Sequence, residues 1–448
     1  MKPNILFINP WIHDFSAYDY WMKPLGLLYM AAYLRNNAMN VRFIDCLTPK
    51  DPFGGKDPGL KIPTRKTGGH GKFPKEAIQK PIALSHISKP FNRYGMTESF
   101  FKNLLRQGPR PDLVMTSVMM TYWYPGAFDA IKIVKEIYPG VPIVLGGNYV
   151  TLCPDHASKS GADFLLSGEG EYHIPFIVRN ILGSSLLYEP DLEQPGALPY
   201  PALDLLIEPD QAPILTSRGC PFRCAYCASH RLNRGFIRRQ PSDVVNEMVH
   251  WEKKLGVRDF SFYDDALFTK PDHMAFPIMH EIIDRGLSYR FHCPNGLHLR
   301  EITPELARLM FASGFKSLRF GFETSDTEKQ LALGGKANNS HLEMAMAYLR
   351  EAGYDTHDIG IYILCGLPGQ AYQEVYETIR YVRSRGAKPI LAEFSPIPQT
   401  MMWQTAVDAS LFPIEEEPLF HNNSLLSCRD ESITLSGYHE LKRLTRTL

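Results

Sequence analysis

Thr216-Ser-Arg-Gly-Cys-Pro-Phe-Arg-Cys-Ala-Tyr-Cys227 places three cysteines, Cys220, Cys224 and Cys227, in a CxxxCxxC spacing. Thiolates are soft ligands, so three of them within one short stretch can hold a metal centre. A cubane iron–sulfur cluster is usually held by four cysteines. This motif supplies three, which would leave one iron open to bind a substrate. The apolar Ile214-Leu215 before the motif predicts a strand that ends in a loop, which is where barrel enzymes keep their chemistry.

The stretch closely resembles the cysteine motif of the radical S-adenosylmethionine (SAM) superfamily. In that family the open iron of a [4Fe-4S] cluster binds the amino and carboxylate groups of SAM, and an electron from the cluster releases a 5′-deoxyadenosyl radical. The resemblance implies that the three cysteines are the catalytic metal ligands, and that Tyr226 lies against the adenine. It also implies an electron donor, such as a flavodoxin or a ferredoxin, as a partner.

A structural zinc site is the main alternative interpretation of the motif. His230 lies three residues after Cys227 and would complete a Cys₃His set of zinc ligands. The chain would then be a zinc-stabilised binding module without catalysis. Disulfide bonds are a weaker interpretation, because three closely spaced cysteines cannot all pair. The pattern downstream favours the iron–sulfur cluster over zinc.

The composition limits the class of protein. At 448 residues the chain can form two or three domains, and a hydrophobic fraction of 44% supports sizeable cores. Lys+Arg and Asp+Glu are equal at 48 each, so no net charge indicates nucleic acid or an acidic membrane surface. The apolar start is too short for a signal peptide, and no apolar stretch reaches the length of a membrane span. The scattered cysteines outside the motif fit a reducing compartment, so we expect a cytoplasmic protein without membrane or nucleic-acid partners.

The N-terminal part, residues 1–183, alternates strands and helices. This alternation predicts an α/β fold with a doubly wound, Rossmann-like parallel sheet. Ligands bind such sheets outside the carboxyl ends of the strands. Ser117, Gly146 and Gly147 stand at such ends. The predicted strands are Ile5–Ile8, Val41–Ile44, Asp112–Ser117, Pro142–Leu145 and Phe164–Leu166, and the predicted helices are Pro24–Arg35, Pro125–Ile137 and a segment from Gly168 to about Leu182.

This part resembles the cobalamin-binding domain that often precedes a radical SAM barrel. The similar pieces are Pro24–Leu27, Gly146-Gly147 and Gly168–Glu171. The resemblance implies that Ser117, the glycine pair and Glu169 contact cobalamin. The DxHxxG loop, whose histidine ligates cobalt in many cobalamin proteins, is absent from residues 1–183, and radical enzymes of this group often lack it. The alternative interpretation is that the glycines only form tight turns at strand ends.

Two segments interrupt the alternation. Residues 47–107 form an insertion that is rich in glycine, proline and lysine, and a loop of this length is usually functional or disordered. Its last part, Thr97–Arg106, is predicted to be helical. Residues 184–210 are predicted to be a linker, because their prolines disfavour both helix and central strand.

Residues 211–400 repeat a strand–helix unit six times, two fewer than a closed eight-unit barrel has. We therefore predict a partial (β/α)₆ TIM-type barrel, which is the fold of the radical SAM family, with residues 401–448 as a C-terminal cap. The predicted strands are Ile214-Leu215, Phe260–Phe262, Tyr289–His292, Ser317–Phe320, Gly360–Leu364 and Ile390–Phe394. The predicted helices are Pro241–Leu255, Pro271–Arg285, Pro304–Ser313, Ser340–Ala352 and Tyr372–Arg385.

Polar residues and glycines follow several of these strands. Asp264 and Asp265 stand where the family receives the amino group of SAM, and a carboxylate near an ammonium group is physically sensible. Asn295 can hydrogen-bond ribose or carboxylate. The resemblance implies that Glu323 binds the ribose hydroxyls, and that Gly366 lets the backbone approach the adenine. The alternative for the aspartate pair is a solvated loop.

Two further cysteines, Cys293 and Cys365, stand at strand ends. Cys365 could donate a hydrogen atom to a substrate radical, but a small buried apolar role is the commoner one for a free cysteine.

The leading hypothesis is a radical SAM enzyme that uses cobalamin to methylate an unactivated carbon of a small molecule or a peptide. The alternative hypothesis keeps the radical chemistry but gives the N-terminal sheet a substrate-binding role. Rearrangement, cyclisation or oxidation without cobalamin would then be the reaction.

Overall fold

The structure is a computed structural model that describes residues 2–66, 68–194 and 196–446. Residues 1, 67, 195 and 447–448, which belong to the predicted N-terminal domain, insertion, linker and cap, lie outside the described residues. The chain divides into two compact units, Met1–Asp210 with Glu417–Leu419 and Gln211–Glu416 with Phe420–Leu448. The extents of the domains, linker and cap named above stay predictions.

The first unit is built on a five-stranded parallel sheet with the order β10-β9-β8-β1-β4. Counted along the chain, this is the flavodoxin-like strand order, whose topological switch point lies between the first and third strands. The strands are β1 (Asn4–Asn9), β4 (Asn40–Asp45), β8 (Leu113–Ser117), β9 (Ile143–Gly146) and β10 (Phe164–Leu165). All five predicted strands are therefore confirmed.

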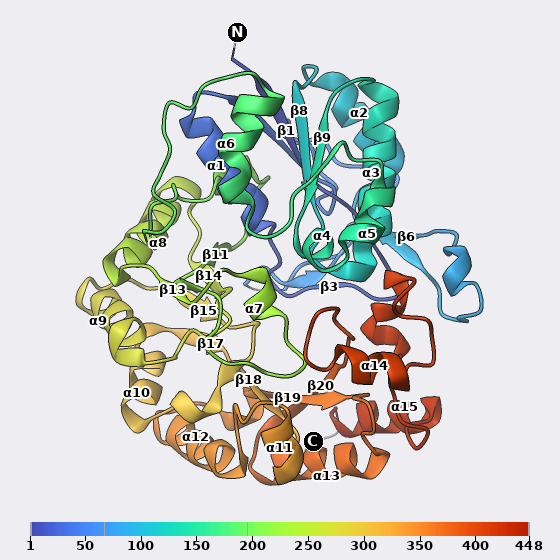
Figure 1. The fold of residues 1–448 in the computed structure, drawn as a ribbon. Coiled ribbons are helices and arrows are strands. Elements are labelled where there is room, and N and C mark those ends of the chain that lie inside the picture. The colour runs from blue at the N-terminus through green and yellow to red at the C-terminus, as the bar shows by residue number, and fades with distance from the viewer. Residues whose placement is uncertain (1, 67, 195, 447–448) are drawn as a thin grey trace. The chain divides into compact units, whose positions relative to one another are not determined.

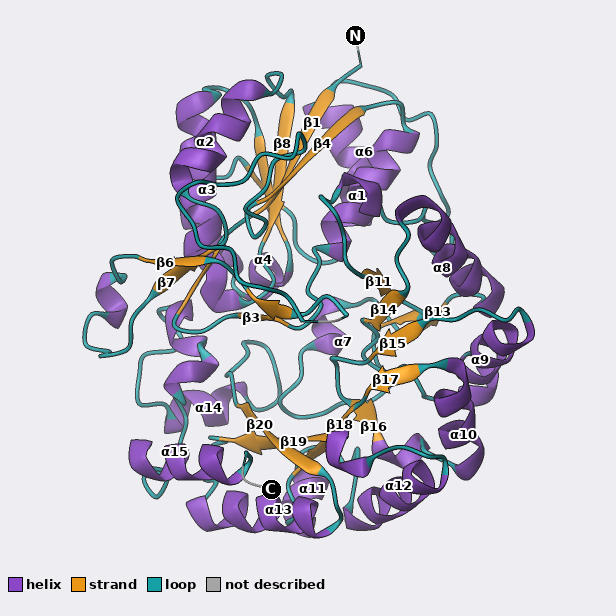
Figure 2. Cartoon of the chain, turned by 180° about the vertical axis from the view of Figure 1, so that it is seen from behind, coloured by secondary structure: helices purple, strands orange, loops and turns teal. Residues whose placement is uncertain are grey.

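Helices cover both faces of this sheet. α1 (Leu25–Asn36) and α6 (Ile174–Phe176) lie on one face, and α2 (Glu98–Gln107) and α3 (Tyr124–Ile137) lie on the other (Figures 1 and 2). This arrangement confirms the doubly wound fold.

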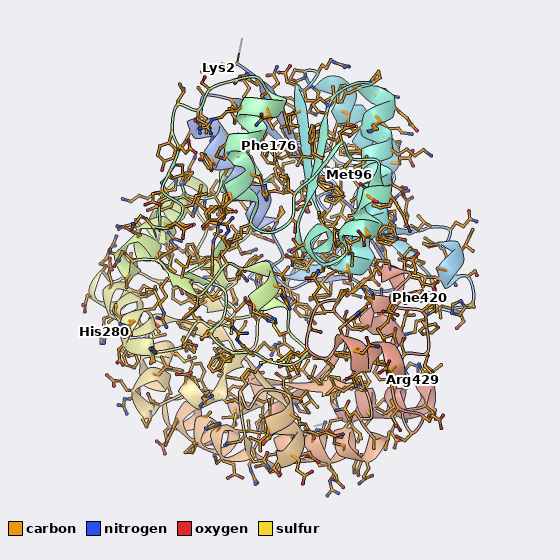
Figure 3. All side chains as sticks on the ribbon, viewed as in Figure 1. Lys2, Met96, Phe176, His280, Phe420 and Arg429 are labelled. Atoms are coloured by element: carbon orange, nitrogen blue, oxygen red, sulfur yellow. The ribbon has the colours of Figure 1, made fainter. Side chains whose placement is uncertain are left out.

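The core under α2 and α3 contains Met96, which is labelled in Figure 3 and is 1% exposed. The Met96 carbonyl oxygen accepts a hydrogen bond from Trp11 Nε1 at 2.7 Å. The buried indole therefore has a partner for its polar atom, as a buried tryptophan usually does.

The segment after Glu169 differs from the single helix that the sequence predicts. It forms η4 (Gly170–His173), the short α6 and η5 (Ile177–Ile181), which is a π-helix. Pro175 stands at the first turn of α6 and brings no amide hydrogen to the helix ladder, which favours an irregular start.

The insertion is folded into small antiparallel ladders. β7 (Asn92–Tyr94) pairs with β6 (Lys75–Ala77) and also with β2 (Ile12–Asp14), which follows β1. β5 (Gly71–Lys72) pairs with β3 (Tyr18–Asp19). The predicted helix at the end of the insertion is confirmed as α2.

The proline-rich segment before residue 211 packs on α1. Asp204 forms an ion pair with Arg35 at 2.9 Å, and the Ala202 amide donates to the Leu28 carbonyl at 3.0 Å. Within its described part this segment carries only the one-turn helix η6 (Leu203–Leu205), as its prolines lead one to expect.

The second unit contains the six predicted strand–helix units in its described residues. The strands are parallel and fall into two sheets, β11-β14-β15-β17 and β16-β18-β19-β20. They are β11 (Ala212–Ile214), β14 (Asp259–Phe262), β15 (Arg290–His292), β16 (Leu297–His298), β17 (Phe315–Ser317), β18 (Arg319–Glu323), β19 (Gly360–Cys365) and β20 (Lys388–Glu393). The partial barrel is confirmed.

The fourth predicted strand, Ser317–Phe320, is not continuous. It is divided at Leu318 into β17, which pairs with β15, and β18, which pairs with β19. The strand changes partners as the barrel wall turns, so one stretch of sequence serves two sheets.

Helices line the outside of this barrel in chain order (Figure 2). They are α8 (Pro241–Leu255), α9 (Ala275–Asp284), α10 (Pro304–Ser313), α12 (Asn339–Glu351) and α13 (Tyr372–Ser384). α8 and α10 agree with the prediction at both ends, because a proline begins each helix and a left-handed glycine ends it. The predicted helix Pro271–Arg285 is instead η7 (Pro271–His273) followed by α9, on which the labelled His280 is exposed (Figure 3).

Two helices follow the last strand of the barrel, α14 (Trp403–Ala409) and α15 (Leu435–Leu444). α15 packs on α13, and its Lys442 binds Glu393 of β20 at 2.9 Å. Among the helices of the described chain, none has the length and apolar character needed to cross a membrane.

Candidate functional site

The three cysteines of the motif lie on the loop between β12 (Ser217–Arg218) and α7 (Ser229–Leu232). β12 pairs with β13 (Ile237–Arg238), which follows α7, so the two ends of the loop are held together. Gly219 has φ +74°, and a Cβ there would stand 2.1 Å from the Gly235 carbonyl oxygen. Only glycine fits this close approach, so the base of the loop is fixed before the first cysteine.

The thiols of the loop form no disulfide bond, and two of them raise the pKa of the third. Burial raises the pKa of Cys220 to about 11, and Asp265, Cys224 and Cys227 add to the rise. Such thiols become thiolates when a metal centre replaces their protons. In the described chain, Cys224 and Cys227 are the cysteines that shift the pKa of Cys220, and no fourth one does so. Three free thiols on one loop therefore fit a cubane cluster with an open iron.

The zinc alternative is not favoured. Within residues 2–66, 68–194 and 196–446, no group of three or more His, Cys, Asp or Glu side chains could hold a single metal ion. His230 therefore does not complete a ligand set with the cysteines. A structural zinc ion needs four ligands about 2.0–2.3 Å from one centre, whereas cubane ligands bind different irons.

The carboxylate of Asp264 is engaged within the chain. Its Oδ1 accepts hydrogen bonds from Thr216 Oγ1 at 2.6 Å and from the Ser217 amide and Oγ, both at 2.7 Å. The Thr216 amide lies 3.1 Å from both carboxylate oxygens. Burial raises the pKa of Asp264, and these bonds oppose the rise. Asp264 thus ties the end of β14 to the segment that leads into the cysteine loop.

Asp265 and Asn295, by contrast, are exposed. Asp265 Oδ2 accepts one hydrogen bond, from Ser229 Oγ at 2.5 Å, and the Ser229 amide lies 3.5 Å from Cys227 Sγ. Although Asp265 as a whole is exposed, protein atoms around its carboxylate bury that group in part and raise its pKa. Asn295 Nδ2 donates to the Tyr263 carbonyl at 3.1 Å. Each residue keeps one side-chain oxygen without a hydrogen bond from the described chain.

Tyr226 and Glu323, which the sequence assigns to adenine and ribose, contact each other. The Tyr226 hydroxyl donates to Glu323 Oε1 at 2.7 Å. Glu323 has φ +74°, which is unusual for a residue other than glycine, and a β-bulge separates it from Gly321 in the pairing with β19. A bulge re-aims the side chain that follows it, and here it places the carboxylate against Tyr226.

Two further residues lie at this place that the sequence did not predict, Lys336 and His298. Lys336 Nζ forms an ion pair with Glu323 Oε1 at 2.8 Å and lies 3.3 Å from the Tyr226 hydroxyl. His298 is 4% exposed, and its ring lies 4.6 Å from that of Phe222 in the cysteine loop. Burial lowers the pKa of His298 to about 3, so its imidazole is neutral. The glycine pair before Lys336 was the available sequence signal, since it predicts a turn at this place.

Gly366 and Cys365 are less accessible to SAM and to a substrate radical, respectively, than the sequence implies. The Gly366 amide donates to Gln370 Oε1 at 2.9 Å, and a Cβ on Gly366 would stand 2.9 Å from Leu426 Cδ2. Cys365 is fully buried beside Glu393, and burial raises its pKa to about 12. Cys293 is also buried, at 1% exposure. Both cysteines have the surroundings of small core residues, as expected for free cysteines.

In the first unit, Ser117, Gly146 and Gly147 come together at the carboxyl edge of the sheet. Ser117 and Gly146 are register partners in β8 and β9. Gly147 has φ +94°, and a Cβ there would stand 2.5 Å from the Val118 carbonyl oxygen. The Val118 amide donates to the Gly146 carbonyl at 3.1 Å. Backbone therefore forms this edge, and Gly147 allows the segment after β8 to pack closely against it.

Glu169 stands next to the same edge. The Gly168 amide donates to Thr151 Oγ1 at 2.8 Å, and Thr151 Oγ1 donates to the Gly147 carbonyl at 3.2 Å. The turn before Glu169 is thus tied to the glycine pair after β9. Ligands bind such sheets outside the carboxyl ends of the strands, and residues 1–183 contain no DxHxxG sequence whose histidine could contribute.

Two protein families match the chain. The Radical SAM superfamily matches residues 214–382, and the B12 binding domain matches residues 97–177. An uncharacterised methyltransferase of Pyrococcus horikoshii is 25% identical over 332 residues, which cover 67% of this chain and 70% of the relative. The cytidylyl-2-hydroxyethylphosphonate methyltransferase of Streptomyces wedmorensis is 26% identical over 450 residues, which cover 85% of this chain and 77% of the relative.

The fold is also similar to that of the radical SAM methyltransferase TsrM from Kitasatospora setae, solved with cobalamin and a [4Fe-4S] cluster bound. The TM-score is 0.68 at 16% identity, and the match covers 99% of this chain and 91% of TsrM. The cysteine loop and the strand-end residues of the second unit lie inside the radical SAM match, and the glycine-lined edge of the first unit lies inside the B12 match. The chain therefore contains a radical SAM superfamily domain, with a B12-binding domain ahead of it.

Proposed function

We propose that this enzyme is a cobalamin-dependent methyltransferase that acts on an unactivated carbon of a small molecule or a peptide. The observation that carries the proposal is the group of three free thiols on one loop, in the same chain as a match to the B12 binding domain. Methyltransferase activity is named for two of its relatives, those of Pyrococcus horikoshii and Streptomyces wedmorensis.

The residues of the second unit fit a cluster and SAM. Cys220, Cys224 and Cys227 would hold a [4Fe-4S] cluster, and Glu323 and Asp265 would bind SAM through the carboxylate oxygens that accept no hydrogen bond from the described chain. When bound, the cluster supplies the electron that cleaves SAM to methionine and a 5′-deoxyadenosyl radical, and cobalamin supplies a methyl carrier.

The roles of the two aspartates differ in this proposal. Asp264 positions the cysteine loop, because its carboxylate is buried and satisfied by Thr216 and Ser217. Asp265 is the one that can meet an ammonium group. In the first unit, Ser117 and the backbone of Gly146 and Gly147 would contact cobalamin, beside Glu169. An electron donor such as a flavodoxin or a ferredoxin completes the system.

The test is product analysis after anaerobic reconstitution with iron, sulfide and cobalamin, followed by SAM and a strong reductant. We expect 5′-deoxyadenosine and S-adenosylhomocysteine, with the Cys224→Ala variant as the control that forms no 5′-deoxyadenosine. A protein that binds iron and sulfide but forms neither product contradicts the proposed activity. Formation of 5′-deoxyadenosine without S-adenosylhomocysteine or bound cobalamin favours the alternative, a rearrangement, cyclisation or oxidation without cobalamin.

A further inference from the structure

Lys336 is a largely buried cation in contact with Glu323 and Tyr226, the residues that the sequence assigns to the ribose and the adenine of SAM. Its side chain is 14% exposed, and its Nζ lies 2.8 Å from Glu323 Oε1 and 3.3 Å from the Tyr226 hydroxyl. The same Nζ lies 6.0 Å from the centre of the Tyr226 ring. Burial opposes the charge of Lys336, but Glu323 and the nearby thiols outweigh it and raise the pKa of Lys336.

The backbone delivers Lys336 to this place from the end of α11 (Thr327–Ala332). The Ala225 amide in the cysteine loop donates to the Leu333 carbonyl at 3.2 Å. Gly334 then turns with φ +118°, and a Cβ on it would stand 3.0 Å from Cys224 Cα. The segment that carries Lys336 is therefore packed directly on the cysteine loop.

A missing side chain on β18 makes room for the ion pair. A Cβ on Gly321 would stand 2.6 Å from Lys336 Nζ and 2.9 Å from Glu323 Oε1. The bulge after Gly321 and the left-handed backbone of Glu323 direct the carboxylate into this space. Left-handed residues other than glycine are strained and persist only where surrounding contacts hold them.

We propose that Lys336 is a positioning residue for SAM, which holds Glu323 and Tyr226 so that the second carboxylate oxygen of Glu323 faces the ribose. This inference rests on the proposed function. Lys336 and Tyr226 both bind Oε1, so Oε2 is the oxygen that remains for a ligand. Without the cation, the carboxylate would be buried with only the tyrosine as a donor. An unpaired buried charge either moves toward water or takes up a proton, and either response removes the acceptor.

The competing explanation is an ordinary buried ion pair that only stabilises the barrel. The chain contains a matched example on the outside of the same unit. Glu393 of β20 accepts hydrogen bonds from the Tyr438 hydroxyl and from Lys442 Nζ, and Lys442 Nζ lies 2.8 Å from the Tyr438 hydroxyl. Lys442→Met thus removes a lysine from the same Lys–Glu–Tyr arrangement, but from helix α15 instead of the cysteine loop.

The experiment is anaerobic titration of SAM into the reconstituted full-length enzyme, with the dissociation constant as the readout and the spectrum of the reduced cluster as a second readout. We expect Lys336→Met and Glu323→Gln each to weaken SAM binding about tenfold, which is the size of one charge-assisted hydrogen bond. The double variant should bind no more weakly than Glu323→Gln alone, because Lys336 acts through Glu323. Lys442→Met should leave the dissociation constant unchanged.

The double variant also separates a binding effect from a folding defect. It removes both buried charges together, so neither charge is left unpaired in the folded protein. A wild-type enzyme that assembles a cluster but binds no SAM contradicts the proposed function. If the wild type binds SAM and Lys336→Met binds it equally well, the positioning role is wrong. Additive losses in the double variant also overturn the inference, since they mean that Lys336 acts independently of Glu323.

Discussion

At Gly147 the absence of a single side-chain carbon decides whether the edge of the first sheet can form. The residue has φ +94° and ψ −178°, a conformation that is almost restricted to glycine. A Cβ would also stand 2.5 Å from the Val118 carbonyl oxygen. We expect Gly147→Ala to lower the stability of the first unit by at least about 3 kcal/mol, because backbone strain and a backbone clash add.

The control for this prediction is Gly140, which also has a positive φ, +77°, but no atom within 4 Å of the position of a Cβ. Gly140→Ala should cost only about 1–2 kcal/mol, from backbone strain alone. Urea midpoints of the two variants and the wild type measure both effects. Equal losses in the two variants would mean that the close approach at Gly147 is not what requires glycine.

The two aspartates after β14 should respond differently to the same substitution. Asp264→Asn leaves the donors of Thr216 and Ser217 facing an amide, so we expect a loss of about 1–3 kcal/mol and a lower iron content after reconstitution. Asp265→Asn should leave stability and iron content near those of the wild type, because Asp265 accepts only one protein hydrogen bond and is exposed. It should weaken SAM binding instead. Iron analysis and SAM titration on both variants check this, and the reverse pattern would exchange the proposed roles.

At the scale of single elements, the pairing of β2 with β7 makes the stability of the first unit depend on pH. His13 on β2 is the register partner of Arg93 on β7. Burial and, to a smaller extent, the Arg93 cation together lower the pKa of His13 to about 3. The folded pKa thus lies below the unfolded value of about 6.5. Between these values the unfolded chain binds a proton that the folded chain does not, so stability rises with pH and is lost as the pH falls below 6.5.

His13→Gln should therefore make the first unit less sensitive to acid. The wild type should lose about 2 kcal/mol from His13 between pH 7 and pH 5, since a proton of uptake corresponds to about 1.4 kcal/mol per pH unit. Asp129, whose Oδ2 lies 3.8 Å from His13 Nδ1, is the carboxylate that faces the ring. Urea titrations at the two pH values give the loss, and the exposed His280→Gln variant is the control. If His13→Gln loses as much stability as the wild type between pH 7 and pH 5, a group other than His13 is responsible for the loss.

For the whole molecule, the residues proposed for the two cofactors belong to different compact units. Cys224→Ala should abolish the cluster while the protein still binds cobalamin, because the glycine-lined edge lies in the other unit. Gly147→Ala should lose cobalamin while the second unit still assembles its cluster. Iron, sulfide and cobalamin contents per chain measure both variants. If each variant lost both cofactors, the two units would not fold and bind independently.

The sequence by itself was sufficient for most strands of the three larger parallel sheets and for the helices outside the barrel, but it did not predict the antiparallel ladders of β2, β3 and β5–β7. Continuous apolar runs marked the strands of both units, and proline starts with glycine stops marked α8 and α10 to the residue, because these signals are local properties of the backbone. The spacing of Cys220, Cys224 and Cys227 indicated the family for the same reason, since the ligands of the motif lie on one short loop.

Only the tertiary structure decided how side chains from distant segments meet. It divided one predicted strand into β17 and β18, separated the buried Asp264 from the exposed Asp265, and brought Lys336 to Glu323 and Tyr226. None of these results follows from local pattern, because each depends on a bulge, a glycine without a side chain or a turn that sets direction in space. Residues 13 positions apart, such as Glu323 and Lys336, become neighbours only when the barrel wall and the turn after α11 close on the cysteine loop.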